Sequence, residues 1–154
     1  MGQDPVLNKF GIGYNPADLL WTVSVDKAGF DPTVIEKLLP KTPLAASKTL
    51  FLEKGSDKAG LAHMWLSHKQ QFKDLLNLHN MDQVQQYLYK IMSKGVYYIW
   101  AYNVVKDSRG GMEIVYIINE KLYLHIVFAS NGFIVTAFPT SNSMSYYDKP
   151  RFEY

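Results

Sequence analysis

Histidine is the residue type best suited to proton transfer near neutral pH, and the 154-residue chain has four: His63, His68, His79 and His125. His63 and His68 lie in a segment with helical spacing of apolar residues, roughly 140° apart around an ideal helix. The two therefore cannot share one site unless that helix ends or bends. We interpret His79, which precedes the capping residue Asn80, as a surface or capping residue.

A second cluster follows from period-two alternation in the C-terminal half. A hairpin turn at Asn131-Gly132 brings His125 close to Thr136 on one sheet face, with Tyr116 and Tyr123 beside them. A partly solvated sheet face explains the same pattern without any function. The opposite face collects apolar residues that helices can cover: Leu122, Leu124, Ile126, Phe128, Phe133, Val135, Ala137 and Pro139. A slip of one residue pair keeps this grouping, whereas a β-bulge changes it.

The elements that would position these residues fall into two groups, helices first and strands after residue 95. This order predicts an α+β fold in which N-terminal helices pack on one face of a four-stranded antiparallel sheet. Asn131-Gly132 predicts a type I′ turn. The first 30 residues give no clear element. We expect helices at 31–39, 57–76 with a break near His68, and 80–94, and strands at 96–105, 112–118, 121–128 and 133–140.

Length and composition fit one domain, with 47% hydrophobic residues and a net charge of +2. This mild positive charge permits a nucleic-acid partner and does not require one. The absence of cysteine excludes disulfides, zinc–thiolate sites and a thiol nucleophile. No apolar run approaches the roughly 20 residues of a spanning helix, and residues 1–10 carry no secretory signal, so we expect no membrane partner.

Several enzyme classes leave no motif in the chain. There is no His-Glu-x-x-His pair and no compact cluster of Asp, Glu and His at metal-ligand spacing. Neither the Gly-x-Ser-x-Gly turn of serine hydrolases nor the phosphate-binding loop of nucleotide-binding proteins occurs. Metal hydrolases, serine hydrolases and nucleotide-binding enzymes are therefore disfavoured.

Two short segments resemble a superfamily of toxin nucleases. The helical segment Gly60-Leu61-Ala62-His63-Met64-Trp65-Leu66-Ser67-His68 and the strand segment Asn131-Gly132-Phe133-Ile134-Val135-Thr136-Ala137-Phe138-Pro139 are similar to motifs of the barnase–EndoU–colicin–RelE (BECR) superfamily. The resemblance covers about residues 50–140 and has the helix and strand in the family's order. It implies a BECR-like nuclease core at 51–154, preceded by a packing segment or extension at 1–50.

The resemblance implies RNA cleavage, often of tRNA, without a metal or other cofactor. The ribose 2′-OH attacks the adjacent phosphate and leaves a 2′,3′-cyclic phosphate, which requires a base, an acid and hydrogen-bond donors for the phosphorane. His68 matches the second histidine of the helical motif and takes the leading acid–base role. Thr136 matches the closing-strand threonine and would bind the scissile phosphate. Ser67 departs from the Arg or Lys usual before that histidine, and His63 is either catalytic or structural.

The remaining candidates come from the residues themselves. The alternation argument adds His125 as a second acid or base. Tyr116 and Tyr123 would stack bases or donate to phosphate, although cross-strand packing explains them equally well. Possible phosphate contacts at strand ends are Lys106, Lys121 and the weaker donor Ser141, with a solvated surface as the ordinary alternative.

The resemblance also implies partners and a place of action. Domains of this kind occur at the C-termini of contact-dependent growth inhibition proteins and in related phage toxins. They leave a bacterial cell and act in the cytoplasm of a target cell. Expected partners are RNA, a cognate immunity protein and, for some members, a translation factor such as elongation factor Tu. The alternative is a non-enzymatic α+β domain that binds protein or RNA, such as an immunity protein or an adaptor.

Overall fold

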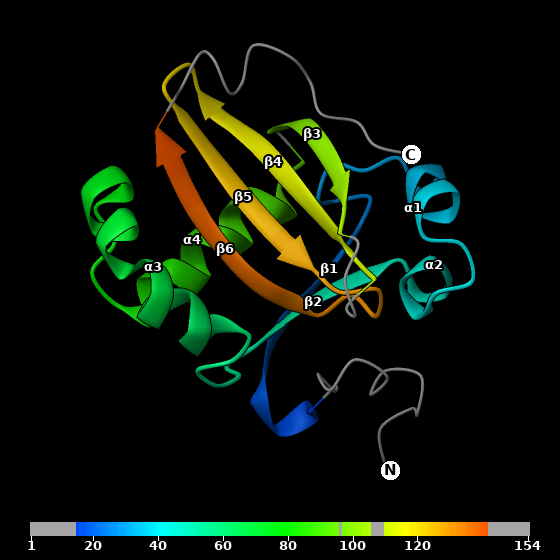
Figure 1. Ribbon diagram of the computed structural model, residues 1–154, viewed down its shortest axis with the longest axis horizontal. Helices are drawn as coiled ribbons and strands as arrows, with labels where there is room; N and C mark the ends of the chain where they lie inside the picture. Colours follow the sequence, from blue (N-terminus) through cyan, green and yellow to red (C-terminus); the bar gives the residue numbers. More distant parts are fainter. Residues whose placement is uncertain (1–14, 96, 106–109, 142–154) are drawn as a thin grey trace.

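A four-stranded antiparallel sheet forms the centre of the computed structural model, which describes residues 15–95, 97–105 and 110–141. Its strands follow the chain in the order β3-β4-β5-β6 (Figure 1). The α+β prediction and the meander are thus confirmed. The strands are β3 (Tyr98–Val104), β4 (Met112–Asn119), β5 (Leu122–Phe128) and β6 (Ile134–Ser141).

Two longer helices precede the sheet in sequence: α3 (Leu61–Leu76) and α4 (Met81–Ser93). The predicted start of α4 is confirmed, because the Asn80 side chain accepts a hydrogen bond from the Gln83 backbone N–H. The expected break near His68 is wrong, since α3 runs unbroken to Asn77, which ends it in a left-handed conformation. Without Gly or Pro in its interior, α3 has no residue that would interrupt it.

The N-terminal part of the described chain adds a two-stranded antiparallel sheet and two short helices. Asp31 caps the first of these helices and Pro32 begins it, as predicted. Sequence patterning did not identify the two strands. In order, the elements are η1 (Pro16–Asp18), β1 (Leu19–Ser24), α1 (Pro32–Leu38), α2 (Pro43–Ser47) and β2 (Thr49–Glu53).

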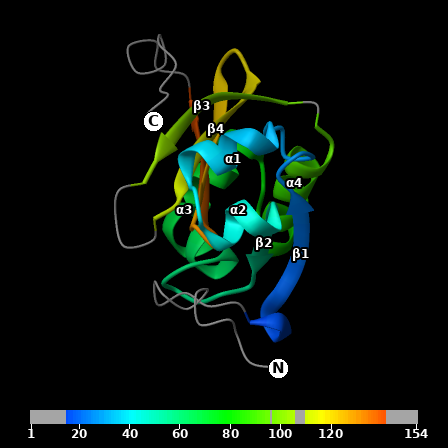
Figure 2. The same cartoon turned by 90° about the vertical axis from the view of Figure 1, so that its right-hand side faces the viewer.

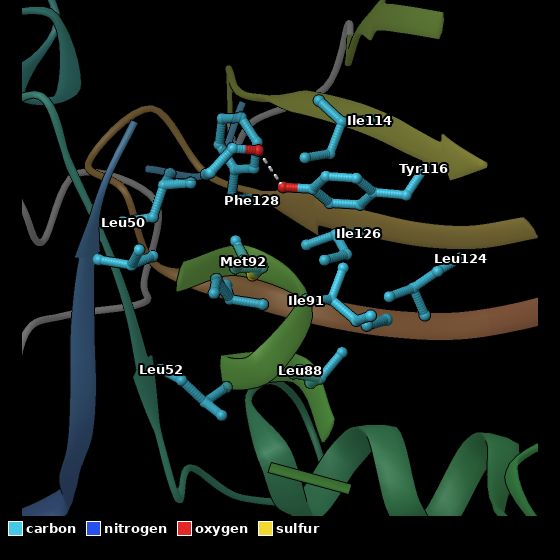
Figure 3. Close-up of a cluster of buried hydrophobic side chains, with 14 of the residues drawn as sticks. Leu50, Leu52, Leu88, Ile91, Met92, Ile114, Tyr116, Leu124, Ile126 and Phe128 are labelled. Atoms are coloured by element: carbon cyan, nitrogen blue, oxygen red, sulfur yellow. Dashed lines mark hydrogen bonds between the residues drawn. The ribbon is translucent and has the colours of Figure 1, made fainter. Parts of the chain in front are cut away.

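One hydrophobic core joins both halves of the chain. The inner face of the sheet packs against α4, which lies behind the sheet in Figure 1. In the side view of Figure 2, α1 and α2 lie toward the viewer and β1 runs next to α4. Ile35 and Leu44, from the first 50 residues, are fully buried in the same cluster as Leu88 and Ile126. Figure 3 shows Leu88 and Ile126 beside Leu50 and Leu52 of β2 in this cluster. Each such side chain contributes roughly 1.5–3 kcal/mol through burial. In the described residues, no helix has the length and apolar character needed to cross a membrane.

The turn between β5 and β6 differs from the predicted type I′ turn. Gly132 has φ of 94°, and Asn131 lacks the positive φ that a type I′ turn needs at both central residues. The Gly132 N–H donates to the Ala129 carbonyl at 2.9 Å, and the Ala129 N–H donates to the Phe133 carbonyl at 2.8 Å. A three-residue loop with glycine in the left-handed position fits these bonds. A side chain at Gly132 would also clash, because its Cβ would lie 2.3 Å from the Thr49 carbonyl oxygen.

A register shift follows this turn, so part of the predicted apolar face is wrong. Beyond the pair Val127–Thr136, Phe128 pairs with Ile134, leaving Val135 as the extra residue of a bulge. Ile134 therefore joins the main core. Phe133 and Val135 instead pack with Val127 in a separate cluster that Phe51 completes.

A second register shift, at the turn between β4 and β5, moves Tyr116 to the face opposite the one predicted. Ile117 pairs with Tyr123 but Asn119 pairs with Leu122, so Ile118 is the extra residue. Because side chains alternate, one extra residue exchanges the two faces of β4. Tyr116 now pairs with Leu124 on the inner face.

The outer edge of β6 is closed by backbone hydrogen bonds from two other elements. The Phe51 N–H of β2 donates to the Gly132 carbonyl, and the Gly60 N–H at the start of α3 donates to the Val135 carbonyl, both at 2.9 Å. The helix α3 therefore runs beside β6, as Figure 1 shows. This placement brings the middle of α3 against the outer-face residues of β6.

Candidate functional site

Two histidines from distant parts of the chain stack on one phenylalanine at the edge of the sheet. The ring centroids of His125 and Phe138 lie 4.7 Å apart with 8° between the planes. His68 of α3 stacks on the same ring, also at 4.7 Å and with 28° between the planes. The strand β5 and the helix α3 border β6 on opposite sides (Figure 1). The Phe138 ring therefore lies between the two imidazoles. We name this group, His68, Phe138 and His125, the histidine stack.

Both nitrogens of His125 have side-chain partners. Nδ1 lies 3.0 Å from Glu113 Oε2, and Nε2 lies 3.0 Å from Thr140 Oγ1. Since an ionised carboxylate can only accept hydrogen bonds, Nδ1 carries the ring proton and donates a hydrogen bond to Glu113. Asn103 Nδ2 in turn donates to Glu113 Oε1 at 3.2 Å. A base oriented by a carboxylate is a recurring arrangement in enzymes that move protons.

His68 is held through a different partner. Its Nδ1 lies 2.7 Å from Gln71 Oε1, one turn along α3. The amide nitrogen of Gln71 donates to the Pro139 carbonyl at 3.5 Å, which directs its oxygen toward the imidazole. Nδ1 is therefore the protonated nitrogen of the neutral ring, and Nε2 keeps a lone pair that can accept a proton.

Thr136 lies on the same face as the stack, as predicted. The register pairs Val127 with Thr136 and His125 with Phe138, so alternate residues of β6 share the outer face. The buried Oγ1 of Thr136 has no hydrogen-bond partner in the described part of the chain. An unpaired buried hydroxyl is costly, so this group is a candidate donor for a ligand atom.

Tyr116 does not belong to the site. It is fully buried in the core, and its hydroxyl donates to the Ala28 backbone carbonyl, the dashed line in Figure 3. Burial, followed by the nearby Tyr102, raises the pKa of the Tyr116 phenol far above its ordinary range. The predicted RNA contact at Tyr116 is therefore wrong, because the Ile118 bulge turns this side chain away from the face that carries His125.

His63, Tyr123 and His79 are held by contacts outside the histidine stack. His63 Nδ1 lies 3.0 Å from the Asp57 carbonyl and so ties down the loop before α3. Tyr123 is on the predicted face but only 8% exposed, and its ring meets Trp100 edge-on with 6.2 Å between centroids. His79 is exposed between α3 and α4, where its Nε2 lies 2.7 Å from Asn77 Oδ1 and its backbone N–H donates to Gln83 Oε1.

The predicted phosphate contacts lie at the margins of the sheet. Lys121 is exposed in the β4–β5 turn, where its backbone N–H donates to the Asn119 side chain. Ser141 ends β6 opposite Leu122 and is also exposed. Lys106 lies outside the described residues. Neither Lys121 nor Ser141 has a hydrogen bond to a residue of the stack among the described contacts.

Four residues of the site, Gln71, Glu113, Phe138 and Thr140, were not predicted as functional. Alternation along β6 already places Phe138 and Thr140 beside Thr136, which was a usable signal. Glu113 could not be found this way, because the Ile118 bulge reverses which residues of β4 face outward. Gln71 contacts the site only through the packing of α3 against β6.

Comparison with known proteins adds no family to this geometry: no protein-family model and no curated protein matches the chain. Within residues 15–95, 97–105 and 110–141, no three His, Asp or Glu side chains gather in a way that could hold a metal ion. The functional interpretation therefore depends on the histidine stack and its hydrogen-bond partners.

Proposed function

We propose that this protein is an endoribonuclease that cleaves RNA without a metal ion, by attack of a ribose 2′-OH on the adjacent phosphate. The observation that carries the proposal is the histidine stack. It holds two imidazoles against one phenyl ring, and a side-chain partner fixes the tautomer of each. Paired imidazoles can supply both the base and the acid that this reaction needs.

The tautomers suggest how the two roles divide. His68 Nε2 accepts the 2′-OH proton as the 2′ oxygen bonds to phosphorus. The bond from phosphorus to the 5′ oxygen breaks, and protonated His125 donates its Nε2 proton to that leaving oxygen. The products are a 2′,3′-cyclic phosphate and a 5′-OH end. Glu113, bonded to Nδ1, stabilises the imidazolium that His125 must form before each turnover.

The outer-face hydroxyls supply the remaining contacts. Thr140 is partly exposed and bonds His125 Nε2, so a substrate oxygen reaches this nitrogen by displacing the threonine hydroxyl. Thr140 and Thr136 would then donate to the non-bridging oxygens, where negative charge develops. Each imidazole centroid is 4.7 Å from that of Phe138, so Phe138 sets the gap that a phosphodiester would span.

The choice of substrate and partners rests on the resemblance to BECR toxins. On that ground we propose tRNA as the RNA, a cognate immunity protein as the inhibitor and elongation factor Tu as a candidate activator. Action in the cytoplasm of a target cell, after delivery from a bacterial cell, belongs to the same proposal. Glu113 is a carboxylate and cannot neutralise RNA phosphates. Lysine or arginine side chains outside the histidine stack must therefore contact the phosphates that flank the cleaved one.

One experiment tests the activity directly. The purified protein is incubated with total bacterial RNA in EDTA, with and without cell extract, and the products are separated on a denaturing gel. We expect discrete fragments with 2′,3′-cyclic phosphate ends. The variant His68→Ala should lose cleavage by a factor of about 10² to 10⁴. His79→Ala, which removes an exposed histidine outside the stack, serves as the matched control.

One observation favours a second function, a domain that binds RNA or protein without cutting. His125 is only 3% exposed and both its nitrogens are hydrogen bonded, as in a structural histidine. Intact RNA in every lane, or equal cleavage by wild type and His68→Ala, would overturn the nuclease proposal. Pull-down with RNA and with protein partners would then follow.

A further inference from the structure

We infer that a cavity at the edge of β3 receives a nucleobase of the substrate RNA, stacked on Tyr98. This inference rests on the proposed ribonuclease function and assigns a subsite away from the reacting phosphate. The cavity has a volume of about 540 Å³ and is lined by Gly29, Gly95, Tyr97, Tyr98, Ile99 and Tyr102. Aromatic rings beside a hollow of this size are typical of sites that bind an unpaired base.

Tyr98 is the clearest sign of a ligand at this place. Its side chain is 81% exposed, the largest value among the exposed large hydrophobic side chains of the described residues. The other aromatic ring in that set, Tyr89 of α4, is 44% exposed and packs edge-on against Trp21. Single-stranded RNA is commonly bound through such rings, because every base has a face that can stack.

Strand register connects Tyr98 to the histidine stack, whereas Ile99 and Tyr102 pair with Tyr116 and Ile114 and so line the cavity from the inner side of β3. Tyr98 pairs with Ile117, Ile117 with Tyr123, and Tyr123 with Thr140, so the four residues form one row across the outer face. Thr140 is the residue whose hydroxyl bonds His125. Three strand spacings separate the ends of the row, roughly 14 Å. An RNA strand that follows this row would therefore bring a flanking nucleotide to Tyr98, and its base would turn around the edge of β3 to enter the cavity.

Charge at the rim suits the same occupant. Lys94 immediately precedes Gly95, and the Lys27 carbonyl lies 3.6 Å from the position of a Cβ on Gly95, so the two segments meet beside the cavity. Lys27 and Lys94 are both exposed. Their ammonium groups can neutralise phosphates next to the bound base, which the negatively charged Glu113 beside the histidine stack cannot do. Three tyrosines thus line the cavity, and the chain segments next to it carry two exposed lysines together with the exposed Asp26.

The test measures binding separately from cleavage. His68→Ala protein is titrated into a fluorescent hexanucleotide RNA, and anisotropy gives Kd with and without the added change Tyr98→Ala. Loss of one base–aromatic stack should raise Kd between about 5-fold and about 100-fold. Tyr98→Trp should restore tight binding, and Tyr89→Ala is the control for loss of an exposed tyrosine. Melting temperatures establish that each variant is folded.

Cleavage by otherwise wild-type protein supplies the second arm. Tyr98→Ala should raise KM for the hexanucleotide much more than it lowers kcat, and the effect should grow with RNA length from a dinucleotide upward. If RNA is cut and Kd is the same with and without the Tyr98→Ala change, this subsite is wrong while the ribonuclease proposal stands. If RNA is bound in a Tyr98-dependent way but never cut, the subsite stands and the catalytic proposal fails.

Discussion

Tyr116 and His125 lie on neighbouring strands, but on opposite faces of one sheet, and both are almost completely buried. The hydroxyl of Tyr116 meets a backbone carbonyl, which has no proton to exchange. The ring of His125 meets a carboxylate and a hydroxyl, which can both take part in proton transfer. The two polar groups are therefore equally buried but differ in the chemistry of their partners, and the proposed proton transfer depends on that difference.

The comparison predicts different consequences for the two faces. Changes on the outer face should act mainly on the rate of RNA cleavage. Changes on the inner face should act mainly on the free energy of unfolding. Three variants test this separation and a fourth tests a buried carboxyl of β2, taken from the largest expected effect to the smallest.

The largest effect is expected for His125→Gln. Glutamine keeps a polar side chain between Glu113 and Thr140 but cannot transfer protons near neutral pH, so cleavage should fall by a factor of about 10² to 10⁴. Initial rates in EDTA measure this, with melting temperature as the control for folding. Cleavage within twofold of the wild-type rate would make His125 a structural residue like Tyr116.

Glu113→Gln should lower kcat by a smaller factor, about 10 to 100. Glutamine keeps a polar partner for the imidazole but removes the charge that would stabilise the positive charge on His125 during the proposed reaction, and initial rates in EDTA measure the loss. Glu120→Gln, an exposed carboxylate in the nearby β4–β5 turn, is the matched control. A Glu113→Gln rate within twofold of the wild-type rate would remove Glu113 from the mechanism.

On the inner face, Tyr116→Phe should leave the cleavage rate unchanged and destabilise the protein. Removing the hydroxyl leaves the buried Ala28 carbonyl without its donor, at a cost of about 1–3 kcal/mol in the free energy of unfolding. Urea denaturation of wild type and variant gives this difference. A large loss of cleavage in a fully folded Tyr116→Phe protein would contradict the assignment of Tyr116 to the core.

Glu53→Gln tests a third buried polar group, at the end of β2, through the pH dependence of stability. Glu53 is 3% exposed and accepts the Asn15 backbone N–H at 2.7 Å. Burial raises the pKa of this carboxyl, with a further increase from Asp18 and an opposing effect of the Asn15 bond. The folded state therefore holds the Glu53 proton more tightly than the unfolded state, and stability falls as pH rises through the folded pKa.

Glutamine has no charge to bury and can still accept the Asn15 bond. Glu53→Gln should thus be the more stable protein at pH 8, and the difference should shrink on acidification toward about pH 4. Urea denaturation at several pH values measures the difference. If the stability difference between Glu53→Gln and the wild type instead favoured the wild type more at pH 8 than at pH 4, the Asn15 bond would outweigh burial.

Helix starts were predictable because Asp31 and Asn80 are capping residues next to apolar positions of helical spacing. The strand β2 was not, because four of its five residues are buried and give no alternation. Residues 114, 115, 117 and 118 of β4 are likewise all aliphatic. No local pattern there fixes which side chains face outward, and the bulge at Ile118 stays hidden.

The candidate site likewise contains some residues that the sequence of one segment predicts and others that it does not. Alternation along β5 and β6 correctly grouped His125 with Thr136, because both strands are regular between the pairs 123–140 and 127–136. Glu113 depends on the bulge, and the stacking of His68 on Phe138 depends on how α3 packs against β6. Contacts of these two kinds come from tertiary structure, so spacing within one segment does not reveal them.

Two backbone bonds close the edge of β6, and one of them, from Gly60 at the start of α3, also ties the helix that carries His68 to the strand that carries Phe138. They join Phe51 to Gly132 and Gly60 to Val135, positions far apart in the chain. Any opening that releases α3 from β6 separates His68 from Phe138 and leaves a strand edge exposed. Amide hydrogen exchange at Gly60 would therefore report the fraction of molecules in which α3 has left β6, read from a proton outside the histidine stack.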